Sequence, residues 1–518
     1  MKKYLKMIDI AALISAMYFS IVWMAYIYLN LTSNVTFTLL LTLFVGIVSY
    51  WGLGFVLGKL RKIKGLKSNE LTRKSRLIVF ATVVIVVFVI RVIWILAYYP
   101  GSFSPDSISQ YGQALSGSYS DWHPVWHTVL FFTIPLKIFG TPASIIIMQN
   151  IYLSLVLGYM AITIAEIWNI KAAVISVAYI VLNPYAGYIM LYPWKDVGFA
   201  MGGLSCSVMA VKLILKKKKI NKLWKLIIFG ILLSWTTLFR HNGILFTAPL
   251  IIVLAFKIDK KIWLKIFVTF VLSLFVIKVP LYSILNVEKP GKRVLESTGL
   301  PLTVIGNAVK ETPYLLDDEI LDFAYSIASQ EQWEESYRCG SFNSIKRIAV
   351  DTSVVEEQGY FGMLRLMFKC FKQASYASFT AFFALTDMVY GFENGLEGDT
   401  GAGITDNDYG IAYTDFRNGK CEEIISTYSA FINGTFFKYV RTYGVALFTM
   451  LILVLSRLKF NSWKSWKRAL MIAPIFCYDF GTMLLLNGAD SRFFFITFLV
   501  TPLLITYTLG AEEGENDV

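Results

Sequence analysis

Long apolar stretches alternate with short polar connections along most of the chain. A helix of roughly 20 apolar residues spans the hydrocarbon core of a bilayer, and twelve stretches come close to that length. They cover residues 7–29, 36–58, 77–98, 142–165, 172–193, 196–215, 224–239, 243–256, 262–285, 440–457, 469–487 and 493–510. The pattern predicts an all-α polytopic membrane protein with a bundle of about 12 transmembrane helices.

Two further apolar segments are predicted to lie on the membrane instead of crossing it. Segment 124–139 is short, and counting it as a crossing would move the lysines 216–219 to the outer side. Segment 362–391 is rich in aromatic residues but is interrupted by charges such as Arg365 and Asp387. We expect both to be outer interfacial or re-entrant helices.

The composition supports the membrane class and narrows the possible partners. The chain has 518 residues, of which 56% are hydrophobic and 16% charged, with a mean hydropathy of +0.58. These values exclude a disordered, collagen-like or ordinary soluble protein. The net charge of +13 and the pI near 9.2 could indicate binding to nucleic acid. In a membrane protein, however, the positions of Lys and Arg along the chain are more informative than their sum, because they indicate the orientation in the membrane.

The basic residues predict how the chain is oriented. More than half of the 48 Lys and Arg fall in alternate connections, which the positive-inside rule assigns to the cytoplasm. The short connections on the other side carry only Lys195, Arg240 and Arg492. We therefore expect a multi-pass cell-membrane protein with cytoplasmic N- and C-termini. Nucleic acid is not needed to explain the charge, and the remaining candidate chemistry lies on the extracytoplasmic side.

The spans and loops divide the chain into four expected parts. These are two N-terminal transmembrane helices with a basic cytoplasmic loop (1–75), a membrane core with its first outer loop at 99–141 (76–285), an acidic extracytoplasmic region (286–439), and three C-terminal transmembrane helices with a short tail (440–518). The acidic region holds three of the five cysteines, which leaves one disulfide possible. Its Gly- and Asp-rich stretch 391–410 is predicted to be a loop. Binding of a divalent cation is the alternative, although no EF-hand pattern is present.

Asp106 opens a predicted helix in the first outer loop, directly after Pro105. One interpretation is a helix N-cap. The other is a general base at the mouth of the membrane domain, because an attacking hydroxyl must lose its proton to a group within hydrogen-bond reach.

Two of the three histidines follow in the segment from Asp121 to His127. His123 could face a substrate, or it could belong to the aromatic belt of the membrane interface together with its tryptophan neighbours. No HExxH or CxxC motif accompanies it, so a metal site has weak support.

Lys195 and Asp196 form an adjacent charged pair at the outer end of two predicted spans. Such a pair is costly there unless it meets water, a partner or a ligand. An interfacial salt bridge is one interpretation. The other is that Lys195 neutralises a phosphate while Asp196 orients Lys195 or the acceptor.

Two arginines occupy similar positions at later outer turns. One lies in Arg240-His241-Asn242-Gly243, and the other is Arg492, which follows Asp490 and Ser491. An arginine at a helix end often snorkels toward water, but its planar guanidinium also suits bidentate phosphate binding. Arg91, inside the third span, is expected to be paired within the bundle or near the outer surface, and not to be catalytic.

At these residues the sequence resembles the GT-C superfamily, whose multi-spanning glycosyltransferases use polyprenyl-phosphate-linked sugars, as protein mannosyltransferases and aminoarabinose transferases do. The resemblance covers residues 76–257. It is closest to an uncharacterised bacterial family of that superfamily, which shares the loop with Asp106, the pair His123-Pro124, the pair Lys195-Asp196 and the Arg-x-Asn-Gly turn at 240–243. Many relatives carry an acidic pair in the first loop, whereas here Ser107 follows Asp106.

The resemblance implies a GT-C-like bundle in which Asp106 activates the acceptor and Asp196 occupies the second acidic position. The expected function is transfer of a sugar from a polyprenyl-phosphate donor to an extracytoplasmic hydroxyl of an envelope glycan, lipid or protein, with inversion. Binding of the substrate or its phosphate is expected from Lys195, Arg240, His241, Asn242, Arg492 and His123. A divalent metal is possible, and no other cofactor is expected. The alternatives are a transporter or flippase for lipid-linked glycans, or a non-catalytic envelope assembly protein.

Overall fold

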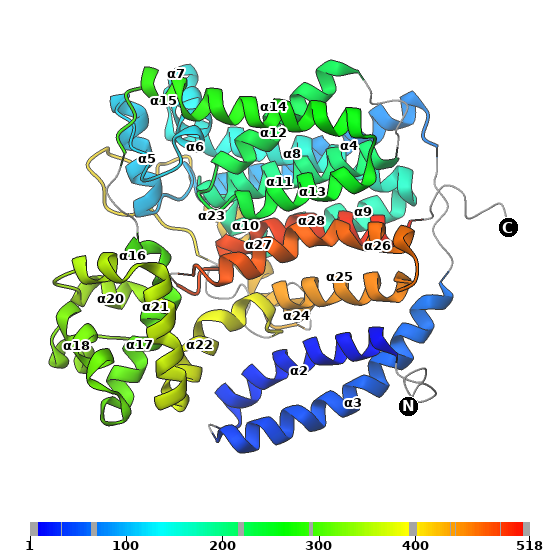
Figure 1. Cartoon of the computed structure of the whole chain (residues 1–518). Coiled ribbons are helices and arrows are strands. Elements are labelled where there is room, and N and C mark those ends of the chain that lie inside the picture. The colour runs from blue at the N-terminus through cyan, green and yellow to red at the C-terminus, as the bar shows by residue number, and fades with distance from the viewer. Residues whose placement is uncertain are drawn as a thin grey trace.

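The computed structural model describes residues 9–32, 34–63, 70–215, 222–289, 294–392, 401–435, 437–440, 442–486 and 488–510. Within these ranges the named elements are all helices, and the chain adds only two isolated β-bridges. Long helices run side by side in a bundle (Figure 1). A smaller group, from α16 (Val294–Ser297) to α22 (Ser375–Tyr390), lies beside one end. We call this group the insert. We call the neighbouring end of the bundle the site end, because the candidate active site described below lies there. The predicted all-α fold is confirmed.

Seven helical segments in the described part of the chain are long and apolar enough to cross a membrane. They are α2 (Ile10–Asn30), α3 (Val35–Lys62), α4 (Arg73–Ala97), α8 (Pro142–Ile167), α11 (Lys195–Leu215), α14 with α15 (Lys260–Ile284), and η4 with α28 (Ser491–Leu509). Each coincides with a predicted span. Length and hydropathy therefore support a polytopic membrane protein.

The other five predicted spans form shorter helices. They are α9 (Ile170–Val181), α12 (Leu223–Leu238), α13 (Ile244–Lys257), α25 (Tyr443–Arg457) and α27 (Ala473–Met483). The predicted span 172–193 is divided because Asn183 caps a new helix, α10 (Pro184–Ile189), and a proline cannot continue the helix before it. The count of about twelve therefore resolves into seven full-length helices and five shorter ones.

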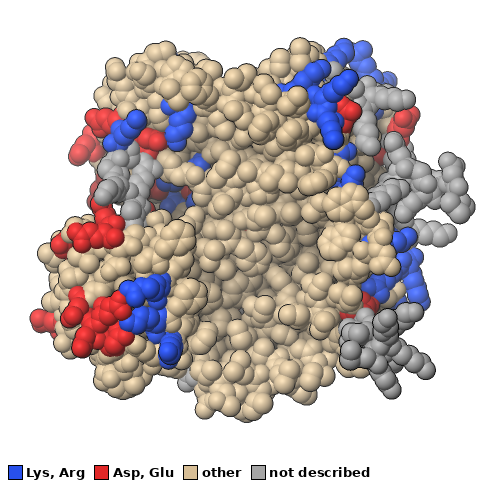
Figure 2. Space-filling model, in the orientation of Figure 1, with Lys and Arg blue, Asp and Glu red and all other residues tan. Residues whose placement is uncertain are grey.

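The surface of the bundle carries a broad uncharged band. Figure 2 shows this band between two margins where the charged side chains gather. On α3 the exposed side chains include Leu43, Phe44, Trp51 and Phe55. A continuous apolar surface of this kind is unfavourable in water but suits contact with lipid. The basic residues 2, 3, 6 and 216–219, which contribute to the predicted orientation, lie outside the described residues.

The interior of the bundle is built around α8, α11 and α28, the most deeply buried of the long helices. Small residues let these helices approach closely. A Cβ atom on Gly203 of α11 would lie 2.2 Å from Cδ1 of Ile496 in α28. The expected pairing of Arg91 is present, because its buried guanidinium donates to Asn150 Oδ1 at 2.7 Å and to the Gly187 carbonyl at 2.8 Å.

The insert surrounds α17 (Gly299–Glu311), whose side chains are largely buried. Trp333 donates to the Ala324 carbonyl at 2.9 Å, and Tyr337 donates to the Thr303 carbonyl at 2.8 Å. The predicted interfacial segment 362–391 forms the second half of α21 (Ser353–Gln373) and all of α22. Since α22 packs on α2 and α25, it joins the insert to the bundle. All five cysteines of the chain are free thiols.

Two other segments complete the site end. Segment 124–139 forms α6 (Val125–His127), the π-helix η1 (Thr128–Thr133) and α7 (Ile134–Phe139), and η1 packs against α5 (Pro105–Ser116). After the insert, the chain returns along the bundle as a loop and α23 (Gly419–Asn433), which packs on α4 and α10. Residues 393–400 of the predicted Gly- and Asp-rich loop lie outside the described residues.

Candidate active site

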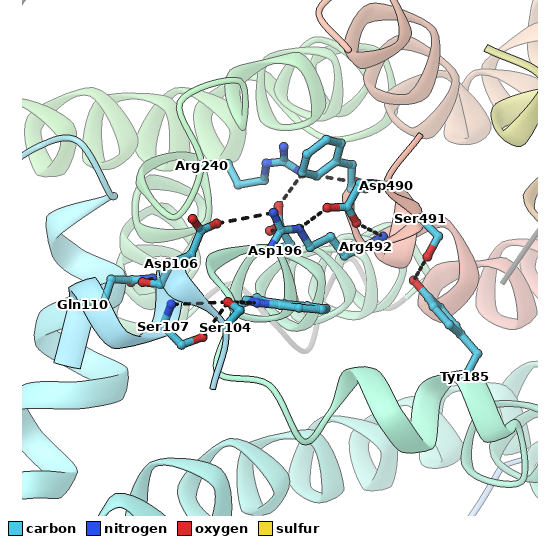
Figure 3. A network of polar contacts seen from close by, with 12 residues as sticks. Ser104, Asp106, Ser107, Gln110, Tyr185, Asp196, Arg240, Asp490, Ser491 and Arg492 are labelled. Atoms are coloured by element: carbon cyan, nitrogen blue, oxygen red, sulfur yellow. Dashed lines mark hydrogen bonds and ion pairs between the residues drawn. The ribbon is translucent and has the colours of Figure 1, made fainter. Parts of the chain in front are cut away.

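Asp106 lies in the first turn of α5, but it is not the N-cap. Ser104 has the extended backbone of an N-cap, and its hydroxyl accepts from the Ser107 amide. The carboxylate of Asp106 is therefore not used for capping. It is directed toward Arg492, whose Nη2 lies 3.4 Å from Asp106 Oδ2 (Figure 3). The side chain of Asp106 remains 36% exposed, so a substrate can reach it.

The start of α5 is fixed by contacts from two distant segments. Trp194 Nε1 donates to Ser104 Oγ at 2.7 Å. The backbone of Phe103 exchanges two hydrogen bonds with the loop after the insert, donating to Gly403 and accepting from Thr405, each at 2.9 Å. These contacts hold the first turn of α5, and thus Asp106, against the bundle.

Asp196 lies in the first turn of α11 and is almost completely buried. Its Oδ1 lies 2.6 Å from Nη1 of Arg240, and its Oδ2 lies 3.6 Å from Nε of Arg492. A buried carboxylate is stable only when a cation or hydrogen bonds compensate for the water it has lost. The two arginines supply this compensation, so Asp196 anchors them both.

Aromatic side chains hold both guanidinium groups in place. Arg240 lies over the ring of Phe493 at 4.6 Å, and its Nη1 also donates to the Tyr478 hydroxyl at 2.9 Å. Arg492 lies over the ring of Trp194 at 4.6 Å. Stacking on aromatic faces suits the planar arginine side chain, and it fixes the direction of the remaining N–H groups.

Arg492 contacts a third carboxylate, Asp490, with Nε and Oδ2 only 2.6 Å apart. Asp490 is a site residue that was not predicted from the sequence, although it lies in the same cluster as Arg492. Its position two residues before Arg492 was the available signal. Arg492 thus lies among three acidic side chains that come from α5, α11 and the segment before η4 (Figure 3).

Lys195 is a cation without a partner among the residues that the structure describes. It forms no hydrogen bond or ion pair there, although Asp106 and Asp196 both lie close enough for their charges to act on it. An ammonium group that forms no direct ion pair can bind an anionic ligand.

The surrounding charges determine the protonation state of Asp106. Burial raises the pKa of its carboxyl group, but the charges of Lys195, Arg492 and His123, with Lys346 of the insert, outweigh this and hold the pKa below its ordinary value of 3.8. Asp106 is therefore a carboxylate at neutral pH and can accept a proton.

The remaining predicted site residues have different surroundings. His123 is buried near enough to Asp106 for its charge to act there. Asn242 donates to Thr482 Oγ1 at 2.9 Å and ties its turn to α27. His241 lies near the Trp122 carbonyl, with Nε2 3.4 Å from the oxygen, and it lines a separate cavity described below. The structure thus gathers Asp106, Lys195, Asp196, Arg240 and Arg492, whereas the contacts of Asn242 and His241 are directed elsewhere.

The donor set at this site consists of carboxylates paired with guanidinium groups. Among the described residues, no group of three or more His, Cys, Asp or Glu side chains is placed to hold a metal ion. What the arrangement offers is a partly exposed carboxylate, a buried carboxylate that positions two arginines, and an unpaired ammonium group.

Comparisons with known proteins give one distant similarity. No protein-family model and no curated protein matches the chain. Its structure is similar to that of an oligosaccharyltransferase from Archaeoglobus fulgidus, solved with a tethered acceptor peptide that contains the NVT sequon. The TM-score is 0.32 and the identity 12%, over 83% of this chain and 49% of the other. The chain thus spans about half the length of that protein.

Proposed function

We propose that the protein is a membrane glycosyltransferase that transfers a sugar from a polyprenyl-phosphate donor to an acceptor hydroxyl on the extracytoplasmic side. The observation that carries this proposal is that a proton acceptor and a cationic group lie side by side at the site end. An ionised, accessible Asp106 lies beside a cationic group formed by Lys195 and Arg492. Chemistry that removes a proton and releases a phosphate needs both.

In the proposed reaction Asp106 accepts the proton of the acceptor hydroxyl as its oxygen attacks the anomeric carbon. The new C–O bond forms as the bond from that carbon to the phosphate oxygen breaks, and the electron pair leaves with the polyprenyl phosphate. The phosphate gains negative charge, which the ammonium of Lys195 and the guanidinium of Arg492 stabilise. A single displacement of this kind inverts the anomeric configuration.

Asp196 acts through the arginines in this scheme. Because it is buried and lies against Arg240 and near Arg492, it holds both before substrate arrives. Preorganised charges of this kind need little rearrangement during the reaction. Asp196 is thus a positioning residue, and Asp106 is the proposed base.

Two charged residues within the spans, Arg91 and Asp479, do not favour the transport alternative. Arg91 is fully engaged by Asn150 and backbone carbonyls, and Asp479 accepts two contacts from the Thr497 hydroxyl. A transport path would require such groups to line a route through the bundle. Both are instead buried in the packed interior.

The test is a transfer assay with the full chain in proteoliposomes. The donor is undecaprenyl-phosphate glucose, the acceptors are glycans and lipids extracted from bacterial envelopes, and release of undecaprenyl phosphate is measured. Asp106→Asn should lower the rate by about 10²–10⁴-fold, the usual contribution of a positioned base. The matched control is Asp322→Asn on the exposed face of the insert, which should retain the rate. Full activity in Asp106→Asn, or movement of the donor across the bilayer without release of undecaprenyl phosphate, would contradict the proposal.

A further inference from the structure

A cavity lies beside the candidate active site, at the ends of α12, α14 and α15. Its volume is about 280 Å³, and its lining includes Asp121, Arg240, His241, Leu274, Lys278 and Tyr282. Arg240 is the shared wall, because it lines this cavity while its Nη1 contacts Asp196 in the candidate active site. The proposed transfer reaction does not use this cavity.

Lys278 is a cationic group to which the fold described above assigns no role. It is the last residue of α14, it is exposed, and it forms no ion pair with the residues that the structure describes. A lysine at a helix end can snorkel to the membrane interface without binding anything. Lys278 differs because it borders a cavity whose lining also contains His241 and Arg240.

The single acidic residue among the described lining residues is restrained by its neighbours. Asp121 Oδ1 accepts from the Tyr282 hydroxyl at 3.1 Å. The Asp121 amide donates to the Glu288 carbonyl at 2.9 Å, which fixes this loop next to α15. The lining therefore carries two cationic side chains, Lys278 and Arg240, and one carboxylate, and this balance favours an anion.

The apolar part of the lining continues onto the lipid-facing surface. Ile244 and Leu274 form part of the cavity wall. On the same helix as Leu274, the side chains of Leu272, Phe275 and Val276 are exposed within a segment long and apolar enough to cross the membrane. An amphipathic molecule could thus place a polar head in the cavity while its chains remain in the bilayer.

We infer that this cavity binds the phosphate group of a membrane lipid. Lys278 provides an exposed ammonium group for the phosphate oxygens, and Arg240 closes the inner wall. Lysine is a common point-charge ligand for phosphate. The inference rests on this cavity alone and holds whether or not the neighbouring site transfers sugars.

Binding is tested with the full chain purified in detergent and examined by native mass spectrometry. The protein is titrated separately with dioleoyl phosphatidylglycerol, undecaprenyl phosphate and inorganic phosphate. We expect Lys278→Gln to weaken binding of at least one of the two lipids about tenfold, the effect of losing one charge-assisted contact. Leu274→Trp should weaken the same lipid by filling the cavity, and it keeps the charges unchanged.

The matched control is Lys261→Gln, which removes an exposed lysine at the opposite end of the same helix. It should leave binding unchanged. An equal loss in Lys261→Gln and Lys278→Gln, or no loss in Lys278→Gln, would overturn the inference. If inorganic phosphate displaced both lipids when present at the same concentration, the cavity would be a site for free phosphate. That result would also overturn the inference. Carrying out the titrations in Asp106→Asn separates lipid binding from any turnover.

Discussion

Arg492 reaches the carboxylate of Asp106 across the site, with Nη2 3.4 Å from Oδ2. These two residues are far apart in the sequence and belong to different helical elements, η4 and α5. Their proximity couples the proposed phosphate-binding group to the proposed base. A donor phosphate that binds Arg492 would partly neutralise its positive charge. The pKa of Asp106 would then rise, and the carboxylate would become a better proton acceptor.

This coupling predicts the pH dependence of Arg492→Gln. Asp106 is active as a carboxylate, so activity falls as the pH drops through its pKa. The charge of Arg492 helps to hold that pKa below its ordinary value, and its removal should raise the pKa. The acidic limb of the pH–rate profile should therefore move to higher pH, besides the loss in rate. Arg365→Gln on the insert surface, where Arg365 pairs with Glu319, serves as the control. A lower rate with an unmoved acidic limb would contradict the coupling.

The buried pair of Asp196 and Arg240 should be important for stability. Asp196→Ala leaves a poorly compensated guanidinium at a buried position, and loss of one partner of such a pair costs about 3–5 kcal/mol. The midpoint of thermal unfolding in detergent should fall clearly. Arg61→Ala tests an exposed pair, with Asp9 at the same 2.6 Å distance, and should cost at most about 1 kcal/mol. Equal losses in the two variants would show that burial does not determine the cost.

The contact between Trp194 and Ser104 should matter more for catalysis than for folding. Trp194→Phe keeps an aromatic ring next to Arg492 but removes the hydrogen bond to Ser104, worth about 1 kcal/mol. We expect a several-fold lower transfer rate with a nearly unchanged unfolding midpoint, because α5 loses one of its fixed points. Trp224→Phe, at an exposed position, is the control. An unchanged transfer rate in Trp194→Phe would show that this hydrogen bond does not help to position Asp106.

Close packing of α11 on α28 predicts a strong effect of Gly203→Ala. The added methyl group would lie 2.2 Å from Ile496 Cδ1, and overpacking of this kind typically costs about 1–3 kcal/mol. Shortening the neighbour in Gly203→Ala/Ile496→Val should recover part of the loss in thermal unfolding. Gly52→Ala is the matched control, because nothing lies within 4 Å of its added Cβ. A destabilised Gly52→Ala would instead indicate a general intolerance of alanine in these helices.

Cys339 can report the side of the membrane on which the insert lies. It is exposed, and a membrane-impermeant maleimide should label it in intact cells if the insert is extracytoplasmic. Burial and Glu311 raise the pKa of this thiol, so labelling should be faster at pH 8 than at pH 7. The background variant carries Cys421→Ser and Cys477→Ser, and Cys339→Ser should abolish the signal. Labelling only after the cells are opened would reverse the predicted orientation.

The sequence alone determined the class of the protein and many of the residues that gather at the site end. Hydropathy is a local property, so runs of apolar residues were sufficient to predict an all-helical membrane bundle. Charges next to apolar runs are costly, which singled out Lys195, Asp196, Arg240 and Arg492 before any contact was known. The same logic correctly expected Arg91 to be paired inside the bundle.

Only the tertiary structure decided which of these groups act on one another. The N-cap interpretation of Asp106 was wrong because Ser104 performs that role, and a side-chain cap depends on backbone geometry that sequence spacing does not determine. Arg492 contacts the carboxylates of Asp106, Asp196 and Asp490 because three separate chain segments meet there. Ion pairs and cavities depend on distances between residues remote in sequence, and those distances follow from how the helices pack.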